Sequence, residues 1–105
     1  MTIIPIEQVK RRNRDAGRYF FEPDTMRFFR SRAPQTAVQS EDKAYFVTSE
    51  QFDDRSPRLY TVRVCNLSTG DIDTVGKFQG HATSAEARRA IEGLIEGRKT
   101  EAERP

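Results

Sequence analysis

Residues 59–65 read Leu-Tyr-Thr-Val-Arg-Val-Cys, which is the clearest strand pattern in the chain. Aromatic and β-branched residues are enriched in strands. Successive side chains of a strand point to opposite faces of a sheet, so the tyrosine and both valines share one face. The turn signal Ser68-Thr69-Gly70 follows, and we expect residues 71–79 to return antiparallel beside the first strand. The fold is therefore built around an antiparallel sheet.

Two further strands are expected upstream, at residues 36–39 and 44–50, joined by a four-residue turn over 40–43. One mismatch concerns the returning segment, where Ile72, Val75 and Phe78 cannot all lie on one face. A bulge near Gly76, or a second, partly covered face of the sheet, would resolve it.

Helices are expected at both ends of the chain. Pro5 suits a first helical turn, apolar residues follow at spacings of three and four, and Gly17 is a stop signal, which predicts a helix over 5–16. The sequence Thr83-Ser84-Ala85-Glu86 is a capping box, and the apolar periodicity after it predicts a second helix ending at Gly97. Between these helices, residues 18–21 are predicted to form a short strand and residues 25–30 a helical turn running into an extended piece.

These elements predict an α+β fold: an antiparallel sheet of three to five strands with the N-terminal and C-terminal helices packed on one face. A chain of 105 residues allows a single core. We expect one domain over residues 1–97 and a charged, flexible tail over residues 98–105.

Charge and apolar patterning exclude several classes of protein. Lys and Arg number 18 against 16 Asp and Glu, a net charge of +2 that does not by itself indicate nucleic-acid binding. The apolar residues at 3–6 are not preceded by a basic segment, and no apolar run reaches the length of about 18 residues that a membrane span needs. We expect a soluble, cytoplasmic protein without membrane contact.

The sequence offers little catalytic chemistry. His81 lies near Ser84 but lacks an orienting carboxylate at any recognisable spacing, and Cys65, the single cysteine, lacks an activating base. Asp71 with Asp73, and Asp53 with Asp54, lack the loop spacing of a calcium site. We therefore expect no catalytic residue, no cofactor and no metal, and a protein that is not an enzyme.

The N-terminal third is basic and aromatic. Residues 1–33 carry eight basic and four acidic side chains, interleaved with aromatic pairs at 20–21 and 28–29. Exposed arginines with aromatics suit phosphate contact and base stacking, whereas the same aromatics could instead form the core. The residues predicted to bind a partner or nucleic acid are Lys10, Arg11, Arg12, Arg14, Arg18, Arg27, Arg30 and Arg32.

Two resemblances follow from the order of elements. A helix, three strands and a helix, with residues 83–89 in the place of a basic second helix, resemble the double-stranded-RNA-binding domain, although the lysine-rich run of that family is absent. Residues 58–96, a hairpin followed by a capped helix, resemble the arm-binding domain of tyrosine integrases, which implies DNA contact through the sheet.

A third resemblance covers residues 5–95 and is carried by the segments 17–29, 46–53 and 69–76. In these segments the chain is similar to short uncharacterised proteins of tailed phages and prophages. The resemblance implies a mobile-element accessory protein, a class that includes anti-CRISPR inhibitors and DNA-binding accessories.

Two functions are consistent with these observations. The first is a non-enzymatic binding module of phage or prophage origin that engages a host macromolecule, with inhibition of a defence nucleoprotein as one form. The alternative is a nucleic-acid-binding accessory protein that uses the arginine-rich surface around the first helix.

Overall fold

The computed structural model describes residues 2–28 and 30–102, with side chains described through residue 97. Its elements follow the order β1 (Thr2–Pro5), α1 (Ile6–Asp15), α2 (Pro23–Phe28), β2 (Thr36–Ser40), β3 (Lys43–Gln51), β4 (Arg58–Asn66), β5 (Ile72–Val75) and α3 (Ser84–Ala102).

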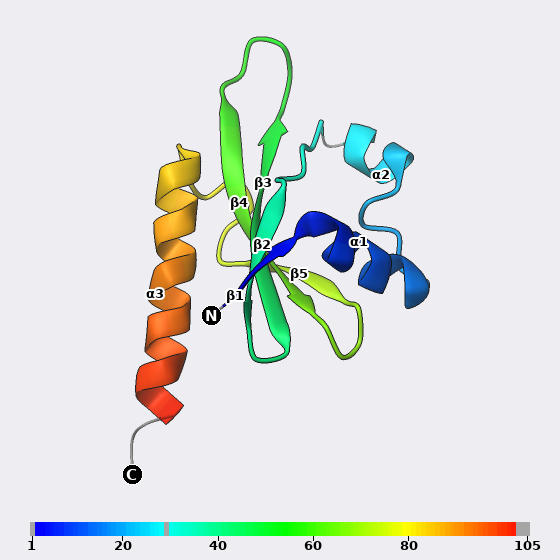
Figure 1. Cartoon of the computed structure of the whole chain (residues 1–105). Helices are drawn as coiled ribbons and strands as arrows, with labels where there is room; N and C mark the ends of the chain where they lie inside the picture. Colours follow the sequence, from blue (N-terminus) through cyan, green and yellow to red (C-terminus); the bar gives the residue numbers. More distant parts are fainter. Residues whose placement is uncertain (1, 29, 103–105) are drawn as a thin grey trace.

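The five strands form one sheet in the order β1-β2-β3-β4-β5, and every neighbouring pair is antiparallel. The α+β prediction with an antiparallel sheet and a helix towards each end is confirmed. β3 and β4 are the longest strands and pair along their whole length, from Lys43 with Asn66 to Gln51 with Arg58. They form the centre of the molecule (Figure 1).

The two long helices lie on opposite faces of this sheet, so the prediction that both pack on one face is wrong. In β3, Ala44 and Phe46 belong to the same buried cluster as Ile6 and Val9 of α1. Tyr45, one residue out of phase, belongs to the cluster that contains residues of α3. Because a strand alternates its faces, the two clusters lie on opposite sides. Figure 1 shows α1 and α3 on either side of the strands.

Strand β5 explains the mismatch seen in the sequence. Ile72 pairs with Cys65 and packs in the α1 cluster, whereas Val75 pairs with Val62 and packs in the α3 cluster. The sheet is thus covered on both faces. The strand stops at Val75, and the next contact with β4 is a bridge between His81 and Tyr60. Residues 76–80 leave the ladder between these two contacts and are called the bulge below, so the strand predicted over residues 71–79 is limited to β5.

Three local predictions need correction. Residues 18–21 form no strand, because Asn13 in α1 holds them in a turn: the Arg18 amide donates to its carbonyl and the Phe20 amide to its Oδ1. The turn between β2 and β3 contains two residues, not four, with Glu41 in the left-handed region at φ 57°. Strand β1 is absent from the sequence prediction, because its four residues are too few to show a period.

The capping box at α3 is confirmed with one change. The Glu86 amide donates to Thr83 Oγ1 at 3.1 Å, while Glu86 Oε2 accepts from the Ala82 amide at 3.1 Å, one residue before the expected partner. The helix continues through Gly97 to Ala102, so Gly97 does not end it. The rest of the predicted tail, residues 103–105, lies outside the described residues.

The element order also differs from that of the double-stranded-RNA-binding domain, because β1 precedes α1 and the five-stranded sheet is covered on both faces. The β4–β5 hairpin followed by α3 does match the arrangement expected from the integrase resemblance. Here, however, β4 contributes Val62 to the cluster under α3 and Cys65 to the cluster under α1.

Candidate functional site

Several of the predicted basic residues are held by neighbouring groups. Arg12 is partly buried; its Nε donates to the Leu67 carbonyl at 2.6 Å and its Nη2 to the Ser68 carbonyl. It therefore holds α1 against the β4–β5 turn. Arg18 forms an ion pair with Asp71 at 2.8 Å.

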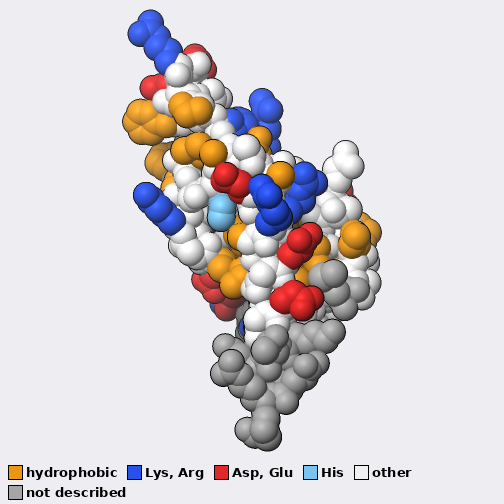
Figure 2. Space-filling model, turned by 90° about the vertical axis from the view of Figure 1, so that its left-hand side faces the viewer, with side chains coloured by type: hydrophobic (Ala, Val, Ile, Leu, Met, Phe, Trp, Pro, Cys, Tyr) orange, Lys and Arg blue, Asp and Glu red, His pale blue; other side chains and the backbone are white. Residues whose placement is uncertain are grey.

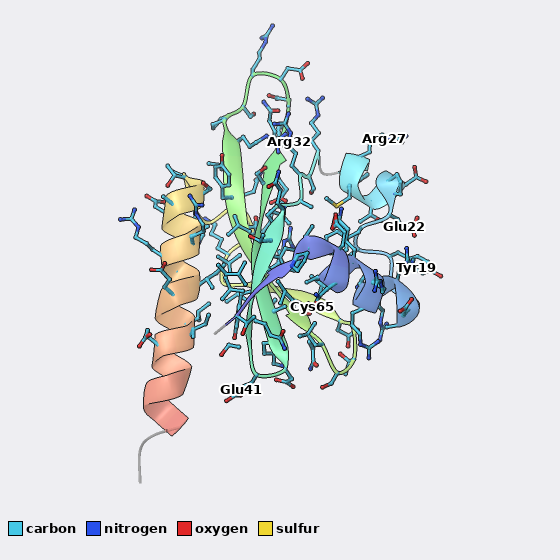
Figure 3. All side chains as sticks on the ribbon, in the orientation of Figure 1. Tyr19, Glu22, Arg27, Arg32, Glu41 and Cys65 are labelled. Carbon is cyan, nitrogen blue, oxygen red and sulfur yellow. The ribbon has the colours of Figure 1, made fainter. Side chains whose placement is uncertain are left out.

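The next three basic residues have partners near α2 and α1. Arg30 pairs with Asp54 of the β3–β4 loop, and Arg27 lies 3.8 Å from Asp24. The Lys10 ammonium lies 5.8 Å from the ring centroid of Phe21. Arg11, Arg14 and Arg32 are exposed, and none has a carboxylate within 4 Å among the described residues. The eight residues lie on α1, on α2 and in the segments after each of them, and Arg27 and Arg32 are labelled in Figure 3.

The aromatic residues divide between core and surface. Phe20 and Phe21 make edge and tilted ring contacts with Phe46, at centroid distances of 6.1 and 5.8 Å, and close the α1 cluster. Tyr19 and Phe28 are 70% and 79% exposed. Phe29 lies outside the described residues.

A second set of residues, which the sequence did not single out, forms a polar patch on the α1 face of β3 and β4. The patch consists of Thr48, Glu50, Thr61 and Arg63. Alternation places them on the α1 face, beyond Phe46 and Cys65, where the face changes from apolar to polar. Thr48, Glu50 and Thr61 are at most 1% exposed, and the Arg63 side chain is 11% exposed. Burying such groups is costly unless each one is paired.

The pairing within the patch is incomplete. Thr61 Oγ1 donates to Glu50 Oε1 at 2.6 Å and itself accepts from the Gln79 amide at 2.9 Å. Arg63 Nε donates to Thr48 Oγ1 at 3.1 Å. The ion pair between Arg63 Nη2 and Glu50 Oε2 is 3.7 Å long, and Oε2 accepts no hydrogen bond from any described residue. One oxygen of a buried carboxylate is thus left short of a donor.

Aromatic rings stack on the arginine of the patch. The guanidinium carbon of Arg63 lies 5.3 Å from the centroid of Phe20 and 5.4 Å from that of Phe78, within cation–π range. Burial lowers the pKa of Arg63, and the charge of Glu50 opposes that shift. Phe78 reaches this position because it lies in the bulge 76–80, where Gly76 and Gln79 adopt positive φ.

Two cavities open on either side of Phe78. One, of about 230 Å³, is lined by Arg63, Phe20 and Met26, among others. The other, of about 350 Å³, is lined by Glu50 and by three aromatic rings and two glutamines, namely Phe28, Phe52, Phe78, Gln51 and Gln79. Phe52 is 83% exposed and lies in the β3–β4 loop. On the side of the molecule that carries α3, hydrophobic side chains gather at the surface near one end (Figure 2).

The patch and its surroundings bring three kinds of group together. A buried carboxylate, a stacked guanidinium and exposed aromatic rings combine charge selection with large contact area. His81, the histidine considered as a base, pairs with Tyr60 through its backbone. Among the described side chains, those of residues 2–28 and 30–97, no three His, Cys, Asp or Glu residues are grouped closely enough to hold a metal ion. No helix in the same ranges is long and apolar enough to cross a membrane.

The alternation of a strand alone shows that Arg63 and Val62 point to different faces of the sheet. It also shows that Glu50 points to the same face as Phe46 and Thr48. What the sequence lacks is the information that both faces of β3 and β4 are covered. A charged residue in phase with apolar neighbours on a central strand is the available signal.

The sequence profile of one protein family matches residues 5–92. The chain belongs to DUF7447, a family of unknown function. The DUF7447 match runs from the end of β1 into α3 and contains the whole polar patch together with Phe28, Phe52 and Phe78, which we call its aromatic rim. No curated protein and no solved structure matches the chain.

Proposed function

We propose that this DUF7447 protein is a non-enzymatic binding module that recognises a partner protein through the polar patch and its aromatic rim. The observation that carries the proposal is the buried pair Glu50–Arg63, incompletely hydrogen-bonded and placed below exposed Phe28 and Phe52. A sequence departs from the rules of core packing mainly at functional sites. Aromatic residues and arginine also dominate the binding energy of protein interfaces.

The proposal includes a biological setting. We place the protein in the cytoplasm, as an accessory of phage or prophage origin that engages a host macromolecule, and inhibition of a defence nucleoprotein is its most specific form. The support is the sequence resemblance to phage proteins. Two segments that carry it, 17–29 and 46–53, supply Phe28, Glu50 and Phe52 of the site.

The test is capture of a partner from host lysate, with and without nuclease treatment, by the wild-type chain and by two variants. Replacing Phe28 and Phe52 together by Ala should abolish capture while leaving the melting temperature unchanged, because both rings are largely exposed. Tyr19→Ala is the matched control, since Tyr19 is similarly exposed but lies outside the site. Capture by the double variant at the wild-type level would overturn the proposal.

Nucleic-acid binding is the second candidate, favoured by the exposed Arg11 and Arg14 on α1. Binding to phosphates releases counterions, so affinity would fall steeply with salt. Replacing both arginines by Ala would flatten that dependence by about one unit for each phosphate that is no longer bound. A mobility-shift assay at two salt concentrations decides the matter. Binding no tighter than roughly 10⁻⁴–10⁻⁶ M, the non-specific range, and unaffected by the double substitution excludes this candidate.

A further inference from the structure

The cavity beside Glu50 has a definite electrostatic character. Glu50 is the one acidic residue among its described lining residues, and the others are two glutamines and the three phenylalanines of the rim, Phe28, Phe52 and Phe78. The faces of aromatic rings attract cations, as does a carboxylate. A cavity of about 350 Å³ is large enough for the head group and part of the stem of a long side chain.

The hydrogen bonds of Glu50 indicate which kind of cation the cavity would bind. An ionised carboxylate offers about four acceptor positions. Thr61 fills one on Oε1, while Oε2 receives none and lies 3.7 Å from Arg63, whose Nε already donates to Thr48. A quaternary ammonium has no N–H group and would leave Oε2 unsatisfied. The missing component is a cation that donates hydrogen bonds.

The molecule already shows how it holds such a group. Arg63 lies between the rings of Phe20 and Phe78 with its guanidinium about equally far from each. Phe78 also lines the cavity beside Glu50, together with Phe28 and Phe52. A planar guanidinium both stacks on rings and donates to a carboxylate, which an ammonium does less well.

We infer that the cavity beside Glu50 receives an arginine side chain from the partner protein, stacked on the phenylalanine rim and donating to Glu50 Oε2. This rests on the proposed function and names the chemistry of the partner. Oε2 is itself covered, so the side chains around it must shift as the arginine enters. Phe52 is 83% exposed and can turn aside with little loss of packing.

Binding at Glu50 is also connected to the bulge that carries Phe78. The Gln79 amide donates to Thr61, and Thr61 donates to Glu50. A guanidinium that binds the carboxylate therefore changes the hydrogen bond from Thr61 and, through Thr61, the one from the Gln79 amide. The amide resonances of Thr61 and Gln79 should report its arrival.

The experiment is a titration of the full chain, followed by amide chemical shifts, with two probes. N-acetyl-arginine amide carries the charged head group, and N-acetyl-citrulline amide is its neutral analogue of nearly equal shape. The arginine probe should shift the amides of Thr61 and Gln79 and bind at least tenfold more tightly than the citrulline probe. Equal affinity of the two probes, or shifts confined to other parts of the chain, would overturn the inference.

Two variants complete the test. Glu50→Gln should weaken the arginine probe at least tenfold, whereas Glu92→Gln, an exposed position on α3, should leave its affinity unchanged. If Glu50→Gln does not fold, Phe52→Ala takes its place with an expected loss of several-fold, since its exposed ring contributes little to the core. Wild-type affinity for the arginine probe in the folded Glu50 variant, or in its Phe52 substitute, contradicts the inference.

The outcomes separate this inference from the function on which it rests. If partner capture depends on Phe28 and Phe52 but the arginine probe does not bind as expected, the proposed binding function stands and the inference of a guanidinium ligand is wrong. Loss of dependence on both phenylalanines removes the function itself.

Discussion

Asn13 ties three parts of the chain together. It is 2% exposed; its Nδ2 donates to the Gly70 carbonyl at 2.8 Å, and its Oδ1 accepts from the Phe20 amide at 3.2 Å. Gly70 lies close by with φ +80°, and a β-carbon there would come within 2.5 Å of the Ala16 side chain. The end of α1 and the β4–β5 turn therefore pack closely, with no room for a side chain at Gly70 and with the Asn13 amide joining them by hydrogen bonds.

Asn13→Ala should destabilise the fold by about 2 kcal/mol or more, because it leaves a buried carbonyl and a partly buried amide without their Asn13 partners. Chemical denaturation measures the change. Arg14→Ala, at an exposed position one residue on, is the control and should stay within about 0.5 kcal/mol of wild type. A similar effect at both positions would mean that Asn13 contributes only its helical propensity.

Cys65 should be chemically inert in the native state. It is fully buried, and burial raises the pKa of its thiol. Its reaction with a disulfide reagent at pH 8 should be slow in buffer and fast in denaturant. Rapid labelling of the native chain would contradict the burial of β4 beneath α1.

The raised thiol pKa has a consequence for pH dependence. The protonated thiol contributes stability that is complete below the unfolded pKa of about 8.5 and is lost as pH rises toward the higher folded value. The free energy of unfolding should therefore decline above about pH 8.5 in the wild type, and less so in Cys65→Ala.

At the level of elements, α3 begins at a cap that is plain from the sequence. Thr83→Ala removes the acceptor for the Glu86 amide and should cost about 1 kcal/mol. For a domain of this size that lowers the melting temperature by several degrees. Ser84→Ala, one residue further on, is a suitable comparison. Equal melting of the Thr83 variant and wild type would show that the cap contributes nothing to stability.

Elements with a strong local signal are predictable from the sequence, and weak ones are not. The alternation of β4 and the capping box of α3 depend on neighbouring residues, so the sequence contains them directly. By contrast, β1 forms because Thr2–Pro5 pair with β2, and residues 18–21 form a turn because Asn13 hydrogen-bonds to them. The polar patch escapes prediction for the same reason, since its members come from strands that meet only in the folded sheet.

At the level of the whole molecule, two hydrophobic clusters share one sheet. Ile6 belongs to the cluster on the α1 face and Ile91 to the cluster on the α3 face, each at most 4% exposed. Because β3 and β4 contribute to both clusters, neither cluster can be lost without disrupting the other.

Ile6→Val and Ile91→Val should each cost about 1 kcal/mol and lower one common melting transition, with additive effects in the double variant. Near-ultraviolet and far-ultraviolet circular dichroism should give coincident curves for all three variants. A separate early transition in one of the single variants would show that its helix unfolds independently of the sheet.

The attachment of α1 to the β4–β5 turn has a consequence for synthesis on the ribosome. Arg12 donates a hydrogen bond to the carbonyl of Leu67, which lies 55 residues later in the chain. At a synthesis rate of about 5–20 residues per second, Leu67 is made roughly 3–11 s after Arg12. A ten-residue helix is only marginally stable alone in water. During this interval Ile6 and Val9 lack the sheet that later covers them, so the nascent chain should be most open to chaperones before residue 67 has emerged.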